Sequence, residues 1–191
     1  LSIVRATRPS RSRLTAGAAS YLVSHRGCLH FRIRVPDDLR PCLGRSELRR
    51  SLQTPSLRQA RPQAMKLAVV AHLIFNLLRE RLAMLSGRKD RLGQGWRGFD
   101  LEALAGLSDE RIRELVNAWL DRALADEWES QLLRAHTPSD PDELRDVLTG
   151  FYREDMEALE ARDYRRIEPQ TLGVLEEAGV VKAGGQGPEA G

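Results

Sequence analysis

The sequence predicts an α+β fold that is mostly α: a small three-stranded antiparallel sheet backed by a long helix, followed by an acidic helical region. Three observations lead to this prediction. Between residues 21 and 53, apolar side chains recur at every second position, as in half-buried strands. From residue 57 to residue 85 they recur every three or four positions, the period of an amphipathic helix. Beyond residue 100, two further stretches have that helical period.

Residues 1–20 are predicted to be a flexible basic arm. They are rich in arginine, serine and alanine, contain Pro9 and have no hydrophobic period. Such a composition buries too little apolar surface to offset the entropy lost on ordering. We therefore place the first folded element at Tyr21.

Residues 21–35 are predicted to form a β-hairpin with its turn at Arg26-Gly27. Strict alternation in the second strand separates two sets of side chains. The apolar set is Leu29, Phe31, Ile33 and Val35. The opposite set is Cys28, His30, Arg32 and Arg34. One face of the hairpin is thus expected to be core and the other basic.

A short helical turn should follow the hairpin. Pro36 ends the strand because proline cannot donate a ladder hydrogen bond. In "DDLRPCLG", Asp37 is a candidate cap for the turn and Gly44 its exit.

The stretch "ELRRSLQT" predicts a third strand, with Leu48 and Leu52 on the core face. Its opposite face carries Arg49, Ser51 and Gln53. Arg50 falls between the two leucines, so either its side chain extends to the rim of the sheet or a bulge turns it outward.

The long helix of residues 57–85 is predicted from one apolar stripe. The stripe consists of Leu57, Ala60, Ala64, Leu67, Ala71, Ile74, Leu78 and Leu85. Pro62 would break a helix interior but is tolerated in a first turn, so we expect the regular helix to begin near Arg61, with residues 57–60 as a separate turn. Residues 86–99 are rich in glycine and charge and are predicted to be a linker.

Residues 100–178 are predicted to form the acidic helical region. One helix should follow Ser108, with acidic residues in its first turn. A second should begin at Pro141, capped by Asp140 and Glu143 in a capping-box-like pattern. A third, short helix is expected over residues 169–178, and residues 179–191 should be a disordered tail.

The sequence offers little for chemistry. Its longest apolar run, residues 67–78, is too short to span a membrane, and a cytoplasmic location is expected. Two cysteines without a C-x-x-C pair and four scattered histidines form neither a disulfide framework nor a zinc motif. We predict no catalytic residues, no metal, no cofactor and no small-molecule ligand.

Charge is strongly segregated along the chain. Residues 1–66 hold 14 Lys and Arg against 3 Asp and Glu, a net charge of +11. Residues 67–191 hold 16 against 24, a net charge of −8. A basic block of this kind is typical of a segment that contacts nucleic-acid phosphates.

We therefore expect the outer face of the sheet to bind double-stranded DNA, since a β-ribbon fits the major groove. The expected DNA-binding residues are Arg26, His30, Arg32, Arg34, Arg49, Ser51 and Gln53. The alternative is a half-exposed sheet whose arginines only keep its outer face hydrated.

The order and spacing of one segment add a family resemblance. The pattern "YL-x4-G-x3-FR-x-RVP-x-DLR-x2-LGR-x-ELRRSLQT-x3-RQAR" resembles the N-terminal domain of phage-type site-specific integrases, the tyrosine recombinases, over about residues 21–85. The resemblance implies an arm-type domain in which a small sheet backed by a helix contacts DNA.

The resemblance does not extend to the family's catalytic residues, which include an H-x-x-R pair and a nucleophilic tyrosine. No H-x-x-R occurs here, so none of the three tyrosines is assigned as a nucleophile. The leading interpretation is the DNA-binding part of a truncated integrase, without strand cleavage. The alternatives are a helical interaction module that self-associates or binds a partner helix, and a decayed mobile-element remnant.

Overall fold

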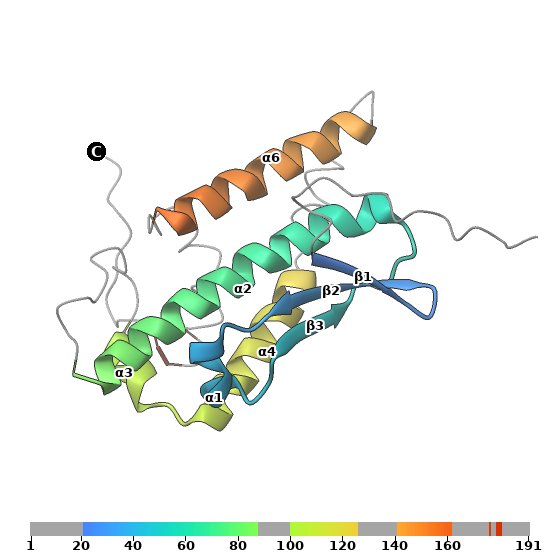
Figure 1. The fold of residues 1–191 in the computed structure, drawn as a ribbon. Helices are drawn as coiled ribbons and strands as arrows, with labels where there is room; N and C mark the ends of the chain where they lie inside the picture. Colours follow the sequence, from blue (N-terminus) through green and yellow to red (C-terminus); the bar gives the residue numbers. More distant parts are fainter. Residues whose placement is uncertain (1–20, 88–99, 126–140, 162–175, 177–178, 181–191) are drawn as a thin grey trace, which may run out of the picture.

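A computed structural model describes residues 21–87, 100–125, 141–161, 176 and 179–180 of the chain (Figure 1). It has the predicted α+β architecture, with a three-stranded antiparallel sheet packed against one long helix. The strands are β1 (Leu22–His25), β2 (Cys28–Arg34) and β3 (Glu47–Ser51). The helical elements are η2 (Asp37–Leu39), α1 (Arg40–Leu43), α2 (Leu57–Leu85), α3 (Leu101–Gly106), α4 (Asp109–Ala125) and α6 (Pro141–Glu160).

The sheet has the order β1-β2-β3, so β2 is its central strand. His25 pairs with Cys28 across the predicted turn, and both intervening residues have positive φ, 49° at Arg26 and 81° at Gly27. This is a type I′ turn, whose twist matches that of the flanking strands. Arg26 lacks the backbone freedom of glycine, so the turn holds it in a left-handed conformation that residues with a Cβ rarely adopt.

Helix α2 begins four residues earlier than we predicted. It is continuous from Leu57 to Leu85, with Pro62 inside it. The expectation of a separate turn over residues 57–60 is therefore wrong. Pro62 lacks the N–H that would reach the carbonyl of Arg58, but its ring is buried, and that apolar contact offsets a missing bond near the helix start.

Helix α2 is buried on more than the predicted stripe because other elements pack on both of its sides. The sheet, α3 and α4 lie on one side and α6 on the other (Figure 1). The additional buried side chains include Met65, Val69, Leu73, Phe75 and Leu77. The two ends of the stripe, Leu57 and Leu85, are in contrast more than half exposed. A single hydrophobic cluster joins the sheet, α1, α2, α4 and residues of α6.

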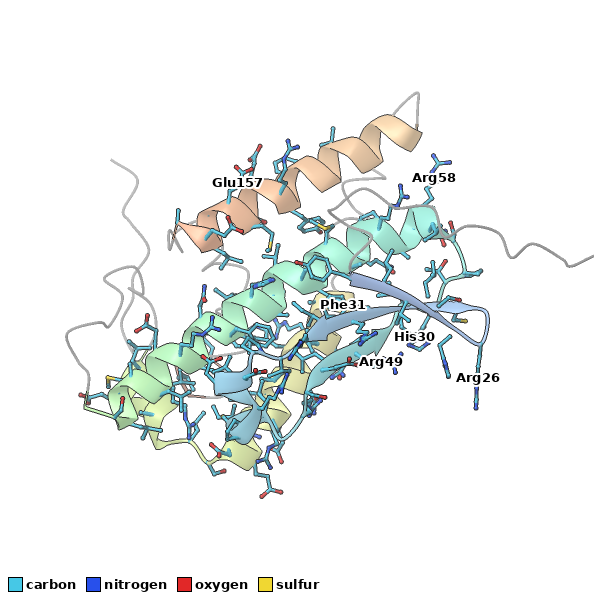
Figure 2. The ribbon with its side chains drawn as sticks, in the orientation of Figure 1. Arg26, His30, Phe31, Arg49, Arg58 and Glu157 are labelled. Atoms are coloured by element: carbon cyan, nitrogen blue, oxygen red, sulfur yellow. The ribbon has the colours of Figure 1, made fainter. Side chains whose placement is uncertain are left out.

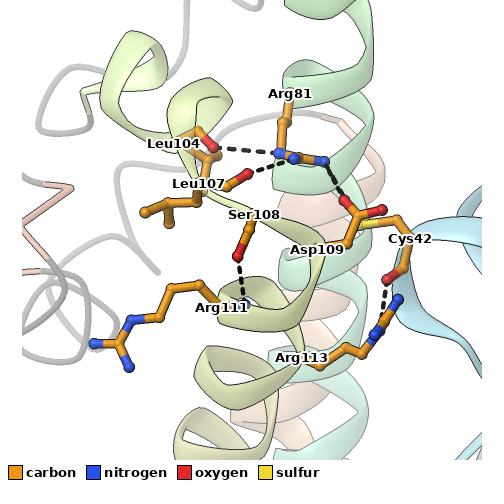
Figure 3. Close-up of polar contacts among 8 residues, drawn as sticks. All are labelled: Cys42, Arg81, Leu104, Leu107, Ser108, Asp109, Arg111 and Arg113. Atoms are coloured by element: carbon orange, nitrogen blue, oxygen red, sulfur yellow. Dashed lines mark hydrogen bonds and ion pairs between the residues drawn. The ribbon is translucent and has the colours of Figure 1, made fainter.

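The start of α4 is joined to α2 by a buried arginine (Figure 3). Arg81 is 6% exposed and donates to the main-chain oxygens of Leu104 at 3.3 Å and Leu107 at 2.6 Å. It also pairs with Asp109 at 3.1 Å. Arg81 thus occupies the carbonyls at the end of α3, a helix that the sequence pattern did not predict.

Two predicted caps have different outcomes. Gly44 ends α1 with φ of 64°, as expected, and its N–H bonds to the carbonyl of Arg40. Asp37 does not cap the turn, because η2 has Pro36 at its N-cap position and no side-chain cap bond. The carboxylate of Asp37 instead forms an ion pair with Arg40, whose Nη2 is 2.6 Å from its Oδ1.

Helix α4 begins where predicted, with the Ser108 hydroxyl accepting from the N–H of Arg111 at 3.2 Å, and α6 begins at Pro141. Asp140, the basic arm, most of the linker, nearly all of the third helix and most of the tail lie outside the described residues. Among the described helices, none combines the length and the apolar composition of a membrane-spanning segment.

Candidate nucleic-acid interface

The register of the sheet brings most of the predicted residues onto one face. His30 lies opposite Ser51, Arg32 opposite Arg49, and Arg34 opposite Glu47. Directly opposed residues of an antiparallel pair point to the same side, here away from α2. Arg32, Arg34 and Arg49 are exposed and His30 is half-buried. Phe31, on the other side, is completely buried against the core (Figure 2).

A carboxylate interrupts this basic face. Glu47 Oε1 accepts from Nε of Arg32 at 2.9 Å and also from its Nη2. It lies diagonally across the ladder from Arg32, whose direct neighbour is the like-charged Arg49. Opposed like charges destabilise a strand pair, so Glu47 offsets the repulsion between the two arginines. Alternation along "ELRRS" places Glu47 on this face, although it was not among the residues predicted there.

Arg34 has a weaker counter-ion. Its Nη2 is 3.6 Å from Oδ1 of Asp37, the oxygen that Arg40 contacts more closely. The Arg34 side chain is 76% exposed and that of Asp37 74%. Exposed ion pairs of this kind contribute roughly 0–1 kcal/mol, so Arg34 exchanges its partner at little cost.

Arg49 and Arg26 are the most available cations of the face. Within the described ranges, neither guanidinium has an ion pair or side-chain hydrogen bond. Arg49 lies in the middle of the face, while Arg26 projects from the hairpin tip (Figure 2). The two cations therefore extend the basic surface along the hairpin.

The remaining predicted residues lie at the edges. The His30 ring meets that of His25 edge-on, with centroids 5.7 Å apart. Gln53 lies beyond the end of β3 with φ of 51°, and its N–H bonds to the Ser51 hydroxyl at 3.3 Å. It lines a hollow with Asp121 of α4, so it borders the face rather than belonging to it.

Arg50 lies on the inner side of β3, opposite Phe31. Its side chain extends past the sheet edge and donates from Nε to Asp121 at 2.7 Å and from Nη2 to the amide oxygen of Asn117 at 2.9 Å. Arg45 reaches the same amide oxygen at 3.2 Å. The strand needs no bulge, and these two arginines attach the sheet to α4.

The exposed guanidinium groups of this face can bind anions. Among the described residues, no cluster of three or more histidines, cysteines or carboxylates could hold a metal ion. The cysteines at 28 and 42 are both free, and burial raises the pKa of the Cys42 thiol, with Asp109 adding to the effect. A buried thiol of raised pKa is a poor nucleophile.

Part of the chain is similar to a known protein family. Residues 21–80, from the start of the sheet through most of α2, match a family described as Domain of unknown function (DUF6538). No curated protein and no solved structure matches the chain.

Proposed function

We propose that the outer face of the sheet binds double-stranded DNA and that the chain does not cleave it. One observation carries the proposal: the register aligns Arg32, Arg34 and Arg49 on one exposed face, and Arg26 extends that face to the hairpin tip. Arginines spaced along a strand can contact successive phosphates, and each contact releases counterions.

The size and stiffness of the face suit a groove. A two-stranded ribbon is narrow enough to enter the major groove of B-DNA, where arginine can contact phosphates or the edge of guanine. The buried apolar side of the same strands packs against α2, so the arginines project from a rigid support. Side chains on a rigid element lose less freedom on binding than side chains on a loop.

We also propose that this is the DNA-contacting segment of an integrase-type recombination protein. This part rests on the resemblance of about residues 21–85 to that family. Many positions of the pattern have structural roles here, among them the buried Phe31 and Leu48 and the left-handed Gly27 and Gly44. The pattern therefore supports a shared fold, and the basic face supports the DNA contact.

Fluorescence anisotropy with a random-sequence duplex at several salt concentrations tests the DNA proposal. With about four to six phosphate contacts, the logarithm of affinity should fall with the logarithm of salt at a slope of about −4 to −5. The double variant Arg32→Ala/Arg34→Ala should bind more weakly, with a slope shallower by about 2.

The matched control removes two arginines elsewhere. Arg111 on α4 and Arg153 on α6 are exposed and lie off the sheet, so Arg111→Ala/Arg153→Ala should change binding little. Equal losses in both double variants would mean that net charge, rather than this face, carries the binding.

A second function has an observation of its own. Val147 and Phe151, one turn apart on α6, are 46% and 42% exposed. Residues four apart share one helix face, so α6 presents an apolar pair through which the chain could self-associate. Sedimentation of the chain and of Val147→Ser tests this: a dimer that the variant dissociates, and that ignores DNA, would favour an interaction module.

A further inference from the structure

A second basic surface lies where β2 runs past the start of β1. Leu22 pairs with Phe31, so the β1 ladder stops before Arg32. A hollow of about 360 Å³ lies at this point, between the strand end and α2. Its polar lining is Tyr21, Arg32, Arg34, His72 and Arg79. Its apolar lining is Ile33, Pro36 and Phe75. None of these side chains is a carboxylate.

Helix spacing explains why α2 contributes three of these residues. His72, Phe75 and Arg79 are three and four positions apart, so they lie on one face of the helix. The His72 and Phe75 rings meet edge-on at 6.0 Å, which fixes the imidazole in place. The Tyr21 hydroxyl lies 3.5 Å from Nε2 of His72.

The phenol and the imidazole of the hollow are both uncharged at neutral pH. Burial and Glu160 raise the pKa of Tyr21. Burial lowers the pKa of His72, the Arg79 guanidinium lowers it further, and Glu160 opposes this. The lowered pKa keeps the histidine neutral at neutral pH. The phenol and the neutral imidazole remain hydrogen-bonding groups beside three guanidinium groups.

The counter-ions of the three arginines all lie on the protein surface. They are Glu47 for Arg32, Asp37 for Arg34 and Asp38 for Arg79. The Arg79 pair has Nε 2.9 Å from Asp38, with both side chains about half exposed. Such exposed pairs contribute little net stability, whereas arginine binds phosphate oxygens in a bidentate fashion.

We propose that this hollow binds a phosphate group and, resting on the proposed DNA-binding function, that the group belongs to a DNA backbone. Arg32 and Arg34 border both the outer face and the hollow. A strand lying along the outer face therefore leads toward α2, where Arg79, His72 and Tyr21 receive its next phosphate. The interface then includes helix α2 as well as the sheet.

Inorganic phosphate is the simplest probe. Millimolar phosphate should shift the His72 ring resonances in NMR spectra of the full chain, with His72→Gln identifying the signals. Arg79→Gln should weaken the phosphate response about tenfold, because a charge-assisted contact is lost. Asp38→Asn should strengthen it, because Arg79 then has no competing carboxylate.

Duplex titrations of the same variants identify the source of the phosphate. Arg79→Gln should lower DNA affinity about threefold to tenfold and reduce the salt slope by about 1, whereas Arg153→Ala should change neither. Circular dichroism verifies that each variant is folded.

Three other results separate the two proposals. A phosphate response at His72 without any DNA binding would support the hollow, overturn the DNA function and identify a free phosphate ligand. DNA binding that is unaffected by Arg79→Gln, with no phosphate response, would overturn the hollow alone. A phosphate response at His72 that Arg79→Gln leaves unchanged would also overturn the proposed phosphate site.

Discussion

Arg49 and Arg50 are neighbours in the sequence and have opposite surroundings. Arg49 lies on the outer face of β3, exposed and opposite another arginine. Arg50 lies opposite the buried Phe31, on the inner side, where its side chain is 19% exposed and bonds to Asp121 and Asn117 of α4. Because side chains alternate along a strand, one of these two arginines lies on the exposed outer face and the other on the partly buried inner side.

The difference shows how one residue type serves both stability and recognition. Arg50 and the buried Arg81 donate to acceptors on α3, α4 and the segment between them, so moving either side chain would break bonds that join these elements to the sheet or to α2. Arginines of the outer face have exposed partners, or none among the described residues, and are available to an external anion. The predictions below test this division.

The largest effect on stability is expected at the buried Arg81 of α2. Arg81→Ala should lower the free energy of unfolding by about 2–4 kcal/mol, because it removes the donor to the Leu107 carbonyl, one of two donors to the Leu104 carbonyl and the pair with Asp109. Urea denaturation measures this. Arg81→Lys should recover part of the loss, since one ammonium cannot reach all three partners. Wild-type stability in Arg81→Ala would contradict the structural role.

The neighbouring arginines should separate stability from binding. Arg50→Ala should cost about 1–2 kcal/mol of stability, because several hydrogen bonds to α4 are lost, and should leave DNA affinity nearly unchanged. Arg49→Ala should change stability by less than about 0.5 kcal/mol and reduce the salt slope of DNA binding by about 1. Denaturation and anisotropy measure these changes in both variants. Equal losses of DNA affinity in Arg49→Ala and Arg50→Ala would contradict the distinction between the two arginines.

Glu47 should oppose DNA binding. Glu47→Gln removes the carboxylate that neutralises Arg32, so duplex affinity should rise by about threefold to tenfold, an effect of roughly 1 kcal/mol. The glutamine keeps the size of the side chain, and Glu114→Gln on α4 removes an equal charge away from the sheet as a control. An unchanged affinity for Glu47→Gln would mean that Arg32 does not reach DNA.

The smallest effect is expected at the hairpin tip, where the two demands conflict. Arg26→Asn should stabilise the fold by about 0.5–1 kcal/mol, because asparagine tolerates the left-handed region and favours type I′ turns. The same change should weaken DNA binding, since it removes an exposed cation. Thermal denaturation measures the gain in stability, and anisotropy measures the loss of DNA affinity. A variant that gains stability and keeps full affinity would remove Arg26 from the interface.

Much of the fold could be predicted from periodicity. Alternation defined both faces of β2 and β3, Gly27 and Gly44 marked the turn and the helix exit, and a period of three to four defined α2. The error at Pro62 arose because a local rule was applied where buried packing prevails. Helix α3 was missed because six residues provide too little periodicity.

The candidate site was partly predictable for the same reason. Which side chains of a strand share a face follows from the sequence, because the side-chain period of a strand is two. The sequence by itself therefore determined the basic face, its segregated charge and the amphipathic helix behind it. It does not reveal which residues of distant segments meet, because contacts such as Arg50 with Asp121 or Arg81 with Leu107 depend on how α2 and α4 pack. Tertiary structure alone decided which arginines are engaged inside the protein and which remain available, and it brought His72 and Arg79 beside Arg32 and Arg34.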